Sequence, residues 1–181
     1  MERSDKELVK ECLGGSRSAF EELVNRYQKV IFNVAYRMVN DHDTAEDITQ
    51  CVFIKGFERM SSYNPKYKFF SWLYRIAINE SLNYINHNRR MAELSDSMIS
   101  KDHTPEEAYS EVELSEKIGD ALMQIDPNHR VVIVLKHFRN CSYKEISDIL
   151  HIPEKTVKSR LFTARQSLRK VLVAKGIIGN E

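Results

Sequence analysis

Glycine, proline and cysteine are all scarce in this chain of 181 residues, which holds six, four and three of them. Few glycines and prolines mean few helix breakers, and no alternating β pattern stands out. The cysteines, Cys12, Cys51 and Cys141, lie far apart without a CxxC pair or ligand spacing, which argues against zinc and favours free thiols in a reducing compartment. These features predict an all-helical protein.

Signals for secretion, membrane insertion and catalysis are also lacking. The first seven residues have no apolar core of a signal peptide, and the longest apolar run, Val131 to Leu135, is far short of a membrane span. The six histidines are scattered, and there is no Gly-rich phosphate loop, GxSxG or HExxH motif. We therefore expect a cytoplasmic protein without a membrane segment that is not an enzyme, with no catalytic residues, metal or cofactor.

The net charge of +1 conceals a strong asymmetry along the chain. Residues 91–116 carry a single lysine, Lys101, against eight acidic residues, whereas residues 117–181 carry 12 basic against 6 acidic residues. A basic C-terminal segment is typical of nucleic-acid binding, and the acidic stretch reads as a solvated linker.

Capping patterns and apolar stripes divide residues 1–90 into four helices. Ser4-x-x-Glu7 opens the first, which ends at Gly14-Gly15, and Ser18-x-x-Glu21 and Asp43-x-x-Glu46 open the next two. Residues 61–68, with Asn64-Pro65, read as a loop, and the fourth helix spans about 70–90. Four helices with short connections predict one compact bundle.

A linker over residues 91–113 leads to a second helical domain over 114–181. Asp126-Pro127 is an N-cap followed by proline and opens a helix to about Phe138, and Ser142-x-x-Glu145 caps a short helix. A turn at 151–153 precedes a last helix over about 154–174, whose stripe starts at Val157 and Leu161. A short helix, a tight turn and a basic amphipathic helix make a helix-turn-helix.

The last helix carries candidate DNA contacts on the faces away from its apolar stripe. Cations suit phosphates and guanine edges, and a phenyl ring suits a thymine methyl. The alternative is a merely solvated basic helix. The candidate residues are Lys155, Thr156, Lys158, Ser159, Arg160, Phe162, Thr163 and Arg165.

Two further clusters lie in the first domain. Residues 63–75 interleave six aromatic residues with Lys66, Lys68 and Arg75, which suits unstacked single-stranded nucleic acid, although Phe69 and Trp72 could instead be core. The third helix begins with acidic residues, which the helix dipole alone would favour, but they also suit a surface for a basic partner helix. That cluster comprises Asp43, Glu46, Asp47, Gln50 and Phe53.

Three segments occur in an order that resembles a known family: Asp43–Phe53 (DTAEDITQCVF), Phe70–Asn79 (FSWLYRIAIN), and Ser142–Leu150 (SYKEISDIL) with Thr156–Leu161 (TVKSRL). Together they resemble the extracytoplasmic-function (ECF) group of bacterial sigma factors over about residues 8–172. Such proteins keep only region 2 and region 4, joined by a linker. The rival interpretation, a stand-alone helix-turn-helix regulator, accounts for residues 114–172 but has no use for the aromatic loop or the acidic helix.

The resemblance implies specific partners and roles. The cluster from Asp43 to Phe53 would bind the β′ clamp helices of RNA polymerase core, whose β flap is a further expected contact. The second domain's last helix would read duplex DNA at the −35 element, and an anti-sigma factor is the expected regulator. The residues implied to melt and read the single-stranded −10 element are Lys66, Tyr67, Lys68, Trp72, Arg75, Asn79 and Asn83.

Two positions depart from the family's usual pattern. Asn83 stands where an acid is often found, and Thr163 where a basic residue is common. Both lie on the implied reading faces, so they bear on promoter preference rather than on the class of function.

Overall fold

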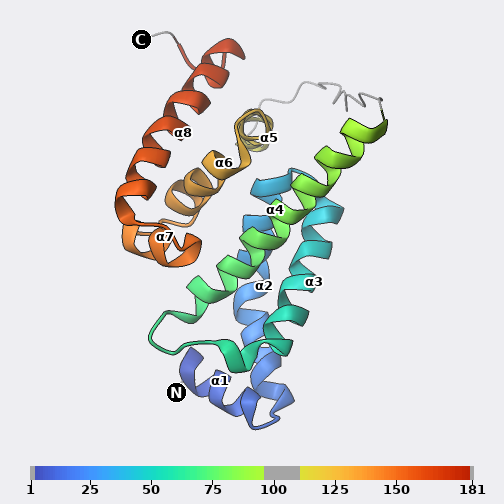
Figure 1. Cartoon of the computed structure of the whole chain (residues 1–181). Coiled ribbons are helices and arrows are strands. Elements are labelled where there is room, and N and C mark those ends of the chain that lie inside the picture. The colour runs from blue at the N-terminus through green and yellow to red at the C-terminus, as the bar shows by residue number, and fades with distance from the viewer. Residues whose placement is uncertain (1–2, 96–110, 180–181) are drawn as a thin grey trace.

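A computed structural model describes residues 3–95 and 111–179, and every regular element in that part of the chain is a helix, as predicted (Figure 1). The first group comprises α1 (Asp5–Leu13), α2 (Arg17–Val39), α3 (His42–Glu58), the short 3₁₀ helix η1 (Met60–Ser62) and α4 (Phe69–Ser95). The second comprises α5 (Glu111–Met123), α6 (Pro127–Ile133), its π-helical extension η2 (Val134–Phe138), α7 (Tyr143–Leu150) and α8 (Glu154–Ala174).

The first group is a bundle in which α2, α3 and α4 pack on one another and α1 packs against α2 (Figure 1). The predicted apolar stripes form its centre, with Leu23, Ile31 and Leu73 at most 1% exposed. Phe69 is buried and Trp72 packs on the same core, so the core alternative for these two rings holds in this structure.

Two predicted helix starts are wrong. The hydroxyl of Ser16, not Ser18, accepts the hydrogen bond that caps α2, and Asp41, not Asp43, caps α3. In both cases a left-handed residue directly before the cap (Gly15 at φ 89°, Asn40 at φ 52°) reverses the chain, so the helix begins about one half-turn earlier than the pattern suggested.

The helix-turn-helix forms as predicted. Asp126 caps α6 with Pro127 in its first turn, and Ser142 and Glu145 make a complete capping box on α7. His151 ends α7 in a left-handed conformation at φ 53°, and α8 begins directly after Pro153. Ile146 and Ile149 of α7 and Leu161 of α8 lie in the buried core of this unit.

The segment expected to be a linker is partly helical. Helix α4 runs through Ser95, beyond the predicted end near residue 90, and α5 begins at Glu111. The rest of that acidic stretch lies outside the described residues. No helix among residues 3–95 and 111–179 is long and apolar enough to cross a bilayer.

The two groups pack directly against each other. Helix α7 lies beside the N-terminal half of α4, and α5 and α6 pack on the end of α2 (Figure 1). Apolar side chains of both groups form one continuous buried cluster. The packing brings residues about 70 to 90 positions apart in sequence into hydrogen-bond contact.

Candidate functional site

Helix α8 presents a basic face with an exposed aromatic ring at its middle. Phe162 is 65% exposed. Thr156 and Arg160 are half-buried, and the remaining candidates, Lys155, Lys158, Ser159, Thr163 and Arg165, are exposed. All eight lie off the buried stripe of Val157, Leu161 and Ala164, so one amphipathic helix separates the core contacts from the free surface.

Neighbouring side chains orient several groups of this face. Arg165 donates through Nε to Nε2 of His137, 3.2 Å away, and partial burial together with Arg165 and Lys136 lowers the pKa of His137. Lys158 Nζ lies 5.6 Å from the centre of the Tyr143 ring. The hydroxyls of Ser159 and Thr163 donate to backbone carbonyls one turn earlier in α8. The face therefore combines positioned cations with small polar groups, as major-groove reading requires.

The loop before α4 exposes the cations and one of its aromatic rings. Lys66, Tyr67 and Lys68 are exposed. The rings of Tyr63, Phe69 and Trp72 form an aromatic cluster beneath them, in which Tyr63 and Phe69 meet edge to face and the other two pairs are tilted. The Tyr63 hydroxyl donates to the carbonyl of Tyr67 at 2.7 Å, which ties the loop to its aromatic base. A cavity of about 350 Å³ opens between this loop, residues 63 and 65–70, and residues 4–6 at the start of α1.

The −10 candidates on α4 divide by environment. Asn79 and Asn83 are exposed, and Trp72 is half-buried. Arg75 is also half-buried, and it donates to the backbone carbonyls of Asp148 and Ile149 in the last turn of α7. Burial lowers the pKa of Arg75. The aromatic loop and α4 thus form one continuous surface, of which Arg75 is turned toward the second group of helices.

The acidic cluster forms one exposed stripe on α3. Asp43, Glu46, Asp47 and Gln50 are exposed and Phe53 is half-buried. The stripe continues into two apolar residues that were not predicted for this surface, Ile54 and Phe57, which are 60% and 56% exposed. Their position off the buried stripe of the helix was the signal in the sequence that could have indicated an apolar contact surface.

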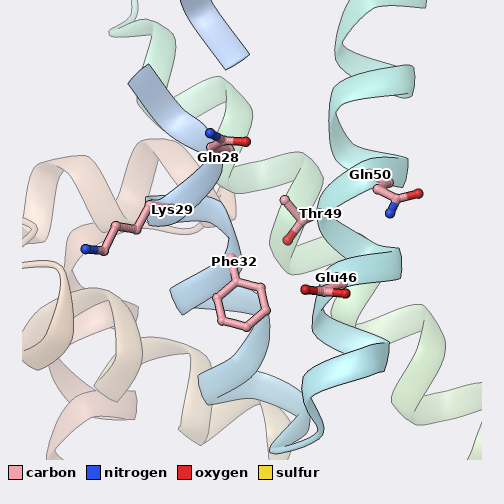
Figure 2. Close-up of a pocket in the computed structure, with 6 residues that line it drawn as sticks. All are labelled: Gln28, Lys29, Phe32, Glu46, Thr49 and Gln50. Carbon is pink, nitrogen blue, oxygen red and sulfur yellow. The ribbon is translucent and has the colours of Figure 1, made fainter. Parts of the chain in front are cut away.

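A groove of about 390 Å³ runs between this face and α2. Figure 2 shows Phe32 of α2 and Glu46 of α3 facing the same gap, with Gln28 and Lys29 along the α2 side and Thr49 and Gln50 on α3. The α2 residues were not predicted. Phe32 lies off the apolar stripe of α2, and an aromatic residue in that position was the signal in the sequence that could have indicated this groove.

An ion pair links α3 to α4 within the bundle. Lys55 of α3 donates to Glu80 of α4 at 2.6 Å, and the Cys51 thiol lies 3.6 Å from the same carboxylate. The hydrogen bond to Glu80 raises the pKa of Lys55. The described residues contain no cluster of potential ligands that could hold a metal ion.

Family models match both groups of helices. Sigma-70 region 2 matches residues 23–91, and Sigma-70, region 4 matches residues 115–168. The match of residues 23–91 excludes the stand-alone helix-turn-helix alternative, which has no counterpart of region 2.

Relatives match the chain over nearly its whole length. The chain is 34% identical to the ECF RNA polymerase sigma factor SigW of Bacillus subtilis, over 95% of this chain and 98% of the relative. It is 31% identical to the RNA polymerase sigma-H factor of Pseudomonas aeruginosa, over 94% and 95% of the two chains.

Solved structures show the same arrangement of helices. CnrH in complex with the cytosolic domain of CnrY superposes with a TM-score of 0.73 at 25% identity, covering 95% of this chain and 99% of that one. The sigma factor RpoE of Bartonella quintana, in complex with the anti-sigma factor NepR, has a TM-score of 0.71 at 24% identity, over 84% and 96% of the chains. The chain therefore belongs to the ECF group of RNA polymerase sigma factors, initiation factors without enzymatic activity that direct core polymerase to promoters.

Proposed function

We propose that three separate surfaces carry out this function: the acidic stripe of α3 binds core polymerase, the loop and α4 capture the −10 element, and α8 reads the −35 element. The observation that carries the proposal is the separation of charge: an exposed acidic stripe on α3 and an exposed basic face on α8 lie on different helices. Domain limits of 1–90 and 114–181, joined by a linker over 91–113, belong to the same proposal.

The α3 stripe suits a basic, partly apolar helical partner, and we assign it to the β′ clamp helices. Its acidic residues offer charge complementarity, and Ile54 and Phe57 offer an apolar contact that desolvates the centre of an interface. The groove beside Phe32 extends the surface onto α2. The β flap is a further expected contact of RNA polymerase core with this chain.

The core-binding assignment is tested by Asp47→Arg, a charge reversal in the middle of the stripe. The matched control is Glu21→Arg, the same change at an exposed position near the start of α2. We expect Asp47→Arg to weaken binding to purified core polymerase by about tenfold or more, because like charges across an interface repel, and Glu21→Arg to bind as wild type does. Equal binding by all three proteins would contradict the assignment.

The −35 assignment is tested in the same way on α8. Lys158→Glu reverses a charge on the exposed face, and Lys175→Glu makes the same change just beyond the end of the helix. Loss of a phosphate or guanine contact weakens duplex binding by roughly tenfold. Lys158→Glu should lower transcription from promoters with a −35 element, with core binding retained. If Lys175→Glu has an equal effect, the loss reflects net charge and the assignment of this face fails.

The −10 assignment rests on exposed cations next to aromatic rings, which suit unstacked bases. Tyr67→Ala removes the exposed ring of the loop, and Tyr84→Ala removes an exposed ring at 38% exposure farther along α4. We expect only Tyr67→Ala to reduce promoter opening, measured by permanganate reactivity of unpaired thymines. Opening that survives Tyr67→Ala unchanged would remove this ring from the site.

A cytoplasmic location and control by an anti-sigma factor complete the proposal. The location is supported by CnrH, whose fold this chain shares and which was solved with the cytosolic domain of CnrY. Control by an anti-sigma factor is supported by RpoE, which was solved with the anti-sigma factor NepR. The test is to identify a protein that copurifies with the chain and add it back, purified, to a transcription reaction. Inhibition specific to this holoenzyme is expected, and unchanged transcription would argue against that partner.

A further inference from the structure

Lys158 is exposed on the basic face of α8, but its ammonium group does not extend freely into solvent. Its Nζ lies 5.6 Å from the centre of the ring of Tyr143, the first residue of α7. An ammonium group within about 6 Å of an aromatic ring is attracted to the electron-rich face of that ring. The contact therefore ties a cation of the second helix of the helix-turn-helix to the first helix.

A carboxylate stands at the usual spacing for pairing with Lys158. Glu154 precedes Lys158 by four residues on α8, and Glu and Lys at this spacing form ion pairs on many helices. On α7 the equivalent spacing does give a pair, in which Lys144 lies 3.0 Å from Asp148. Within the described part of the chain Lys158 pairs with no carboxylate, and its ammonium group lies over the ring of Tyr143 instead.

The ring of Tyr143 is itself held in place. Tyr143 is half-buried and packs against the apolar core. It directly follows Ser142, which forms with Glu145 the capping box that starts α7. Because a tyrosine side chain has few rotatable bonds, packing on the core and a fixed helix start make the ring a rigid platform.

A second lysine lies over the same ring. Lys136 of η2 places its Nζ 5.0 Å from the ring centre and donates to the carbonyl of Cys141 at 3.2 Å. Both cations add to the positive potential beside α7. Lys136 is anchored to the backbone, whereas Lys158 donates to no acceptor in residues 3–95 and 111–179 and keeps its donors for a ligand.

The position of this ring is significant in a helix-turn-helix. The first helix of the motif crosses the DNA backbone, and the N-terminal half of the second lies in the major groove. Tyr143 opens the first helix, and Lys158 lies in the N-terminal half of the second. The ring therefore holds the ammonium group at the boundary between the two helices, on the side that would face DNA.

Holding Lys158 in advance should strengthen DNA binding. A lysine with a long flexible stem loses rotamer freedom when it contacts a ligand, and that loss opposes binding. The ring of Tyr143 removes part of this cost because the ammonium group is already confined. An exposed cation–π contact corresponds to a factor of about two to five in an equilibrium constant.

We propose that Tyr143 is a positioning residue for −35 recognition: its ring holds the ammonium group of Lys158 in place for the DNA, and its hydroxyl does not contact the DNA. The inference rests on the proposed −35 role of α8 and extends that site to a residue of α7. Since the effect comes from the ring, a phenyl ring at position 143 should serve equally well.

The test separates the ring of Tyr143 from its hydroxyl. Tyr143→Phe keeps the ring and Tyr143→Leu removes it, with Tyr143→Met as a second ring-free variant if the leucine variant misfolds. The matched control is Tyr84→Leu, the same change at an exposed tyrosine of α4. Each full-length variant is combined with core polymerase, and holoenzyme affinity is measured for a promoter duplex that the wild-type holoenzyme selects from a random pool. Circular dichroism confirms that each variant is folded.

Tyr143→Phe and Tyr84→Leu should bind this promoter as tightly as wild type does, and Tyr143→Leu about two- to fivefold more weakly. A double-mutant cycle with Lys158→Met shows whether the ring acts through Lys158. Lys158→Met alone should weaken binding roughly tenfold. Adding Tyr143→Leu to Lys158→Met should cause no further loss, and core binding should be unchanged in every variant.

Equal losses in Tyr143→Phe and Tyr143→Leu would overturn the inference, because the hydroxyl would then contact DNA directly. A loss on Tyr143→Leu that persists in the Lys158→Met background would also overturn it, as would no loss at all. If Lys158→Met weakens binding and Tyr143→Leu does not, the −35 assignment stands and the positioning role fails. If Lys158→Met binds as wild type does, Lys158 makes no −35 contact and both proposals fail at this residue.

Discussion

Arg130 of α6 joins that helix to α2 and α5 at the junction of the two domains. Its side chain is only 4% exposed, and burial lowers its pKa to about 10, so it is charged at neutral pH. The guanidinium donates to the carbonyl of Met38 in α2 and to those of Met123 and Ile125, at 3.1 and 3.3 Å. Its Nε has no hydrogen-bond partner among the described residues.

The expected effect of Arg130→Ala follows from opposing terms. Three bonds from a charged donor are worth about 1.5–3 kcal/mol each, so their loss costs roughly 5–9 kcal/mol. Removing a buried charge returns several kcal/mol of desolvation. The difference predicts a net loss of about 2–4 kcal/mol, a large fraction of the stability of a small domain.

Urea unfolding measures this loss as a lower midpoint at constant slope. Arg130→Met serves as the matched comparison because it keeps most of the buried volume, so it should lose less than Arg130→Ala but still about 1–2 kcal/mol for the unpaired carbonyls. If Arg130→Met is as stable as wild type or more stable, the hydrogen bonds contribute nothing net at this junction and the reasoning is refuted.

Three smaller predictions test local features. Ser16→Ala should lower stability by about 1 kcal/mol and Ser18→Ala by almost nothing, measured by thermal unfolding. The reverse order would mean that Ser18 caps the helix, as the sequence pattern suggested. Gly56→Ala should raise stability by roughly 0.5–1 kcal/mol, since the added Cβ meets Leu73 at an ordinary 3.5 Å and alanine favours the helix; destabilisation would reveal overpacking between α3 and α4. The pKa of His137 is lowered in the folded state, so the unfolded chain takes up the proton first as pH falls. The stabilisation from neutral His137 is therefore present above about pH 6.5 and is lost as pH falls towards the folded-state pKa. His137→Gln should make the free energy of unfolding fall less steeply in acid, measured by urea titrations at several pH values. An identical pH profile for the two proteins would contradict that assignment.

The helices were predictable because their signals are local. Capping boxes at Ser4 and Ser142 and the cap at Asp126 each depend on residues within one turn, and the structure confirms them. The caps at Ser16 and Asp41 depend on the conformation of the preceding residue, and left-handed Asn40 has no distinctive pattern around it.

The packing between the domains could not be predicted from the sequence. The sequence around Arg75 does not indicate whether its guanidinium faces solvent or α7. The sequence around Arg130 is likewise that of an ordinary surface arginine on a helix, although α2 covers this residue in the structure. In both cases a contact with a residue more than 70 positions away decides the environment, and no local period or spacing encodes that contact. The exposed candidates on α3 and α8 were easier to predict from the sequence, because an amphipathic helix separates its buried face from its exposed face.

The most direct test of the central claim is promoter-specific transcription by purified core polymerase in the presence of this chain. The account predicts transcripts from a set of promoters that core enzyme alone does not use. Asp47→Arg should lose these transcripts because it weakens core binding, and Lys158→Glu should lose them because it weakens DNA binding. A chain that binds duplex DNA by itself but never supports initiation with core polymerase would contradict the account.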